Sequence, residues 1–164
     1  MRSLELLVCL LLASVVRPAA AQDPALILIG VGRIGGWENS DEEAVAVGAE
    51  YRSPRSYFYV SPMAGFFVSE DSDAYAYAGI YHDFKLGSRW ILTPHLSIGA
   101  YHHGSGNDLG GGFQLQPGID LFYRLASNSR LGVSVRHLSN AGIHDQNPGT
   151  ELVMLLYAIP LEGR

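Results

Sequence analysis

The chain has 164 residues, enough for one domain, and 48% of them are hydrophobic while 16% are charged. Asp and Glu outnumber Lys and Arg by 16 to 11, which gives a formal net charge of −5. Affinity for nucleic acid depends on clustered basic side chains that meet phosphates, so this composition argues against a nucleic-acid partner.

The first residues have the pattern of a secretory signal peptide. Leu6 to Val16 is almost unbroken apolar sequence, and Ala19-Ala20-Ala21 offers small residues at a cleavage point. We predict that residues 1–21 are a cleaved signal peptide and that residues 22–164 form the mature domain. A retained N-terminal anchor is the alternative, which the short apolar run disfavours. The only cysteine, Cys9, would leave with the signal, so the mature domain would have neither a disulfide nor a thiolate ligand.

After residue 22, apolar and polar residues alternate with a period of two, which predicts β-strands. The clearest window covers residues 113–123, where the apolar face consists of Phe113, Leu115, Pro117, Ile119, Leu121 and Tyr123. The window after residue 130 repeats the pattern. Together the predicted strands cover about 25–34, 44–53, 57–69, 74–85, 90–99, 113–124, 130–139 and 150–160, which makes eight.

Alternation alone fits a soluble β-protein as well as an outer-membrane barrel, and three further features favour the membrane. The strands are long enough to cross a bilayer at a tilt. Aromatic residues gather near strand ends, as they do at membrane interfaces. Short connections flanked by basic residues alternate with longer or acidic ones. We therefore predict an all-β fold, an eight-stranded antiparallel transmembrane β-barrel, with Pro62, Pro94 and Pro117 at irregular pairings.

The polar face of each strand would then line the lumen. Eight strands leave a lumen that side chains fill. We expect a buried, structural network there, made of Glu50, His95, Gln114, Gln116, Asp120, Arg124, Ser134 and Arg136.

A group of polar residues near the C-terminus has the composition of a serine hydrolase site. Such a site needs a nucleophile, a base, a carboxylate that orients the base and donors for an oxyanion. His137 and Ser139 share the parity of Leu131, Val133 and Val135, so they would lie on the lipid-facing wall. Glu151 begins the next strand with the same outward parity, and antiparallel pairing would bring it beside His137. Polar residues in that position are costly unless they serve a purpose.

The motif His137-x-Ser139-Asn140-x-Gly142, followed by Asn147-x-Gly149-x-Glu151, resembles the signature of the lipid A 3-O-deacylases, the PagL family. The resemblance covers the last third of the chain strongly and the rest loosely. It implies an eight-stranded outer-membrane barrel with a Ser-His-Glu triad. Ser139 would be the nucleophile, His137 the general base and Glu151 its orienting carboxylate. Asn147 and the Gly142 backbone N–H would form the oxyanion hole, and Asn140 would support the loop.

The resemblance further implies an esterase that removes the 3-hydroxyacyl chain from position 3 of lipid A, without a cofactor. Lipid A in lipopolysaccharide would be the substrate, reached in the Gram-negative outer membrane from the outer leaflet. Whether the barrel forms a homodimer stays open.

Other assignments remain as alternatives. Ser139-Asn140 and Asn147-Pro148-Gly149 are also common turn sequences. A non-enzymatic small barrel of the OmpX type, serving adhesion or envelope integrity, and a soluble lipocalin-like barrel are the rival functions. The histidines at 82, 102, 103 and 144 match no metal-site spacing, so no metal is expected. The acidic loops could bind divalent cations, but scattered carboxylates without a loop ligand pattern are more typical of solvated loop tips.

Overall fold

The computed structural model describes residues 23–35, 43–106 and 108–161. The predicted signal peptide, residues 1–21, lies outside the described residues. Within them the chain forms nine strands: β1 (Leu26–Gly35), β2 (Ala44–Arg52), β3 (Ser61–Ser69), β4 (Ala74–Tyr81), β5 (Phe84–Leu86), β6 (Trp90–His102), β7 (Phe113–Arg124), β8 (Arg130–Leu138) and β9 (Thr150–Pro160). No helix among the described residues is long and apolar enough to cross a membrane.

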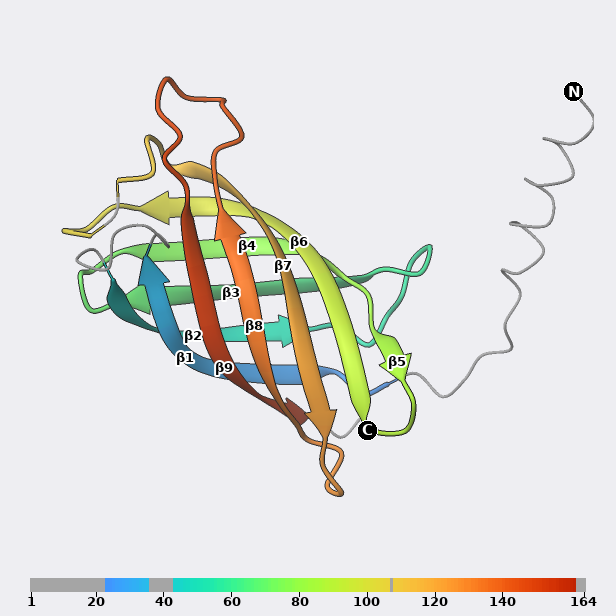
Figure 1. Ribbon diagram of the computed structural model, residues 1–164. Helices are drawn as coiled ribbons and strands as arrows, with labels where there is room; N and C mark the ends of the chain where they lie inside the picture. The colour runs from blue at the N-terminus through green and yellow to red at the C-terminus, as the bar shows by residue number, and fades with distance from the viewer. Residues whose placement is uncertain (1–22, 36–42, 107, 162–164) are drawn as a thin grey trace, which may run out of the picture.

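Eight of these nine strands in the described part of the chain form a closed antiparallel barrel (Figure 1). β1 pairs with both β2 and β9, and the pairing of β4 with β6 completes the circle. The short strand β5 continues the line of β4 along β6 and has no partner strand on its other side. The predicted eight-stranded antiparallel barrel is therefore confirmed.

The outer wall of the barrel is apolar because side chains alternate between its two faces. On β8 the burial pattern alternates without a break from Arg130 to Leu138. Its outward residues Leu131 and Val133 are 45% and 51% exposed. A wall of exposed aliphatic side chains around a closed sheet is stable only against hydrocarbon, which identifies a transmembrane β-barrel.

Charged and polar side chains fill the lumen, and they compensate one another. Arg52 lies between Glu50 and Asp120, with N···O distances of 2.6 and 2.5 Å. Arg136 donates to the same Glu50 at 3.0 Å, and Ser134 donates to Asp120 at 2.5 Å. Two guanidinium groups thus face two carboxylates, the pairing that buried charges require.

The predicted lumen network omits one residue and includes one that lies at its edge. Arg52, the last residue of β2, was not predicted to be part of the network and is fully buried in it. Arg124, which we placed inside, lies at the end of β7 with 26% of its side chain exposed, 3.8 Å from Asp23. Both differences arise at strand ends, where alternation does not specify how far a long side chain reaches along the barrel axis.

Two strands differ from their predicted limits. β3 begins at Ser61 rather than at 57, because Tyr57 and Val60 pair with each other in a small separate hairpin. The predicted strand 74–85 is interrupted at residues 82–83. Pro94 lies opposite this interruption, and proline has no N–H to donate to a neighbouring strand. The prediction of irregular pairing at Pro94 is confirmed.

The two ends of the barrel carry different connections. At the end that we call the turn end, the chain passes through residues 53–60, 82–83, 87–89 and 125–129. At the other, the loop end, it passes through residues 70–73, 103–112 and 139–149. The loop 139–149 extends well beyond the strand ends in Figure 1. The two longest of these connections, 103–112 and 139–149, lie at the loop end, and outer-membrane barrels carry their longer loops outside, which gives this barrel its orientation.

Candidate active site on the outer wall at the loop end

His137 and Glu151 meet across the β8–β9 ladder on the outer wall. They are direct partners in the antiparallel register, and His137 Nδ1 lies 3.2 Å from Glu151 Oε1. The His137 side chain is 48% exposed and that of Glu151 is 23% exposed. When Nδ1–H donates to the carboxylate, the lone pair of the neutral imidazole is on Nε2, the arrangement a general base requires.

Ser139 follows His137 on the same face, one step beyond the end of β8. Its backbone is held by two hydrogen bonds to Leu115 on β7, Ser139 N–H to Leu115 O at 3.0 Å and Leu115 N–H to Ser139 O at 2.8 Å. Successive outward residues of a strand lie about 6.6 Å apart along it. Within the described residues no hydrogen bond joins the Ser139 hydroxyl to His137, and apo sites are often loose in this respect.

Pro117 interrupts the β7–β8 ladder beside His137. The regular pairing covers Gly118↔Arg136 to Arg124↔Arg130. Beyond two unpaired positions, the same register resumes as the single bridge between Leu115 and Ser139. Pro117 stands opposite His137 in this register and has no N–H to donate, which explains why the ladder breaks there. The irregular pairing predicted at Pro117 therefore lies next to the candidate base.

Asn140 organises the loop that follows Ser139. It is fully buried, and its Nδ2 donates to Leu109 O at 3.0 Å and to Gln146 O at 2.6 Å. Its backbone N–H donates to Asn147 Oδ1 at 2.9 Å, and its Oδ1 accepts from Gly142 N–H at 2.9 Å. One side chain therefore links the loop 139–149 to the neighbouring loop 103–112.

These bonds bear on the two predicted oxyanion donors. The Gly142 N–H is engaged by Asn140, so it could serve an oxyanion only after leaving that acceptor. Asn147 uses its Oδ1 to accept from Asn140, which leaves its Nδ2 as the donor of that amide. The Asn147 side chain is exposed. Of the two, the Asn147 amide is the donor with free capacity.

Gly149 lies against the imidazole of His137, a contact that the sequence reading did not identify. Its φ is +69°, and a Cβ at this position would lie 3.0 Å from His137 Cε1 and 3.4 Å from Nε2. The glycine therefore leaves open the space beside the edge of the ring that would take up a proton. Its place in the motif, two residues before Glu151, was the available signal.

Glycines also let the loop 103–112 approach the loop of the site. A Cβ on Gly110 would lie 2.2 Å from Gln146 O, and one on Gly111 would lie 2.1 Å from His144 Cδ2. The run Gly110-Gly111-Gly112 was visible in the sequence, but only the structure shows what packs against it. Among the described residues, no three His, Asp or Glu side chains come together as a metal site would require.

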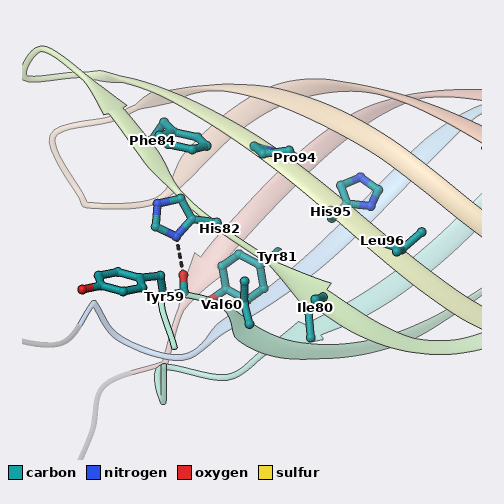
Figure 2. A pocket seen from close by; sticks show the side chains of 9 residues that line it. All are labelled: Tyr59, Val60, Ile80, Tyr81, His82, Phe84, Pro94, His95 and Leu96. Carbon is teal, nitrogen blue, oxygen red and sulfur yellow. Dashed lines mark hydrogen bonds between the residues drawn. The ribbon is translucent and has the colours of Figure 1, made fainter. Parts of the chain in front are cut away.

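A large hollow in the described surface lies elsewhere. It has a volume of about 590 Å³ and is lined by residues of β4, β5, β6 and the 53–60 connection, at the turn end of the barrel (Figure 2). His137 and Ser139 lie at the opposite end, on the outer wall. A site of this kind is open to the bilayer from the side.

A closed, even-stranded antiparallel barrel with an apolar wall defines an outer-membrane β-barrel, here one that carries a His–carboxylate pair beside a serine. Comparison with known protein families then shows which family the chain belongs to. The sequence model described as lipid A 3-O-deacylase (PagL) matches residues 37–160, so the chain belongs to this family.

One relative is the lipid A deacylase PagL of Bordetella bronchiseptica, 41% identical over 73 residues. That match spans 43% of this chain and 41% of the relative. Among solved structures, the outer membrane enzyme PagL has a TM-score of 0.64 at 20% identity, covering 83% of this chain and 99% of that one. Neisserial surface protein A has a TM-score of 0.56 at 12% identity, covering 88% and 100%. At these sequence identities, the similarities to solved structures show a shared fold.

Proposed function

We propose that the protein is an outer-membrane esterase that removes the ester-linked 3-hydroxyacyl chain from position 3 of lipid A. The observation that carries the proposal is the His137–Glu151 pair on the lipid-facing wall, with Ser139 on the same face. Membership of the lipid A 3-O-deacylase family supports the substrate class.

The proposed reaction follows the serine hydrolase scheme. The Ser139 hydroxyl attacks the ester carbonyl, and His137 Nε2 takes up its proton. Glu151 holds the imidazole in the correct tautomer and stabilises the imidazolium that forms. His137 returns the proton to the departing sugar hydroxyl, which leaves an acyl group on Ser139. Water, deprotonated by His137, then hydrolyses the acyl-enzyme and releases the fatty acid.

Asn147 is the proposed stabiliser of the tetrahedral intermediates. Its amide can donate through Nδ2 while its Oδ1 stays bonded to the Asn140 backbone. Donors fixed before the reaction stabilise a developing oxyanion by about 3–4 kcal/mol each. Asn140 acts as a positioning residue in this scheme, since its bonds hold the loop that carries Asn147.

The placement of the site supports an approach of the substrate from within the membrane. The site lies near the loop end, where the outer leaflet meets the barrel. Apolar outward residues, among them Val135 and Val153, continue below the His137–Glu151 pair toward the middle of the wall. An acyl chain could stay in hydrocarbon while its ester reaches Ser139. A water-soluble ester would have no such path.

Mass spectrometry of lipid A from cells that express the protein tests the proposal. The unmodified protein should remove one 3-hydroxyacyl chain, and Ser139→Ala should reduce the rate by at least about 10³-fold. The change lies at the wall, so the barrel should still fold, as heat-modifiable mobility on gels would show. Identical lipid A with both proteins would contradict the proposal and favour a non-enzymatic barrel of the OmpX type.

A further inference from the structure

Arg33 places a positive charge on the lipid-facing wall. On β1 the outward residues Ile29 and Val31 are 50% and 49% exposed, and Arg33 follows with the same parity and 65% of its side chain exposed. Of the outward residues in the described strands, only Arg33 and Glu151 are Arg, Lys, Asp or Glu. Charged side chains that face lipid are costly and mark functional positions, and the cost falls toward the interface, where headgroups can pair with them.

Strand pairing around the closed sheet shows how the strands are staggered. A row of paired residues that starts at Ile34 on β1 passes through the other seven barrel strands and returns to β1 at position 24, when the registers of β2 are continued two residues past Arg52. The row therefore drops ten residues toward the turn end in one circuit of eight strands. Each strand step lowers it by about 1.25 residues, the stagger that tilted strands require.

This stagger places Arg33 at the same height on the wall as the candidate catalytic pair. β1 lies beside β9, and β9 beside β8 (Figure 1). The row from Arg33 reaches β8 at Val135 after two steps, so the point of β8 at the same height lies about 2.5 residues closer to the loop end. That point falls between His137 and Leu138. Two strand spacings and two residue steps separate the Cα atoms of Arg33 and His137, roughly 12 Å.

The guanidinium of Arg33 can bind an anion while it keeps its partner in the barrel. Glu43 Oε2 lies 2.7 Å from Arg33 Nη2, and the Glu43 side chain is 31% exposed. This carboxylate compensates the charge of Arg33 on the empty wall. A guanidinium has five N–H donors in a planar fork, and such a fork matches the oxygens of a phosphate group. Arg33 therefore has donors for a second anion with Glu43 in place.

We propose that Arg33 binds a phosphate group of lipid A and so holds the sugar over β9, with the ester at position 3 at Ser139. The inference rests on the proposed function and adds the group by which the substrate is recognised. Lipid A carries phosphates and acyl chains on the same sugars. One molecule thus offers acyl chains to the apolar wall and an anion to Arg33, at the height where His137 and Glu151 lie.

Binding to an inactive barrel tests the proposal without consumption of the substrate. The full chain with Ser139→Ala is titrated in detergent micelles with phosphorylated lipid A and with the same lipid A after chemical dephosphorylation. Adding Arg33→Gln should raise Kd for the phosphorylated lipid about tenfold and leave Kd for the dephosphorylated lipid unchanged. Arg55→Gln is the matched control, since Arg55 is an exposed arginine of the 53–60 connection at the turn end, and it should change neither value.

Initial rates with Ser139 intact give a second readout. Arg33→Gln should raise KM for phosphorylated lipid A about tenfold with kcat little changed, because the same contact is lost in the ground state and in the transition state. Arg33→Lys keeps the charge but not the planar fork, so its KM should lie between the two. It also serves as the second variant if Arg33→Gln does not fold, as heat-modifiable mobility would show.

Three results would overturn the proposal. Equal changes in Kd for the two forms of lipid A would show that Arg33 only anchors the barrel in the interface. Competition by phosphatidylglycerol as strong as that by lipid A would show a general anion site. Unchanged binding by Arg33→Gln would exclude the contact. Phosphate-dependent binding without deacylation by the unmodified protein would support this proposal and refute the esterase, whereas deacylation without phosphate dependence would do the reverse.

Discussion

The contact between Gly149 and His137 offers a sharp test of how the proposed base is positioned. Gly149→Ala introduces a single methyl group whose carbon would lie 3.0 Å from His137 Cε1. Carbon atoms in good contact are about 3.5–4.0 Å apart, so the ring must move by roughly 0.5 Å. A displacement of about 1 Å in a catalytic geometry costs about 100-fold in rate. We therefore expect kcat for lipid A deacylation to fall about tenfold, with KM little changed.

The change also introduces backbone strain, which must be separated from the contact. Alanine at a φ of +69° costs about 1–2 kcal/mol of stability. Gly87 supplies the control, because its φ is +75° and a Cβ there would meet nothing within 4 Å. It lies in the turn after β5, at the opposite end of the barrel. Gly87→Ala should lose similar stability and keep full activity.

The assay compares the two variants with the unmodified protein at equal amounts of folded barrel. Folded protein is measured by heat-modifiable mobility, and initial rates are measured on purified lipid A in detergent micelles. Full activity of Gly149→Ala would refute the positioning argument. An equal loss in Gly149→Ala and Gly87→Ala would also refute it, since strain alone would then explain the effect.

Three more changes test the site and the lumen. Glu151→Gln keeps the shape of the side chain but removes the charge that supports the imidazolium, so kcat should fall about 10³- to 10⁴-fold. Glu43→Gln is the control: it alters the carboxylate paired with Arg33 at 2.7 Å and should leave kcat unchanged in the same assay. If Glu151→Gln also left kcat unchanged, the triad would be excluded. Asn140→Ala removes the side chain that links the two loops, and hydrogen exchange in residues 140–149 should become about tenfold faster; unchanged exchange would show that other contacts hold the loop. Asp120→Ala leaves the buried Arg52 with one carboxylate, and the free energy of unfolding in urea should fall by about 3–5 kcal/mol. Asp145→Ala, at an exposed loop carboxylate, should change it by less than about 0.5 kcal/mol, and equal effects of the two would contradict the compensation argument.

Much of the fold was predictable because strand alternation is a local property of the backbone. Side chains of a strand alternate between two faces, so the sequence around Leu131 and Val133 already separates the wall from the lumen. The same parity places His137 and Ser139 outside. Because β8 and β9 are joined by one loop, they are expected to pair as antiparallel neighbours, which brings Glu151 beside His137 on β8. None of these steps requires knowledge of distant parts of the chain.

Other features depend on how strands that are distant in sequence meet, and only the tertiary structure decided them. The lumen network joins Glu50 and Arg52 of β2 to Asp120 of β7, a pairing set by closure of the barrel and by the reach of long side chains. The hollow at the turn end lies where β5 extends along β6 beyond Ser61, the first residue of β3, and alternation does not specify how far each strand extends.

The candidate site shows the same division. The sequence determined which residue types lie at the loop end and which face they share, because a period of two fixes both. The tertiary structure decided that Gly149 touches the His137 ring and that Asn140 engages the Gly142 N–H, because turns and left-handed residues set these contacts. Loop conformations have no sequence periodicity, so these contacts follow only from the tertiary structure.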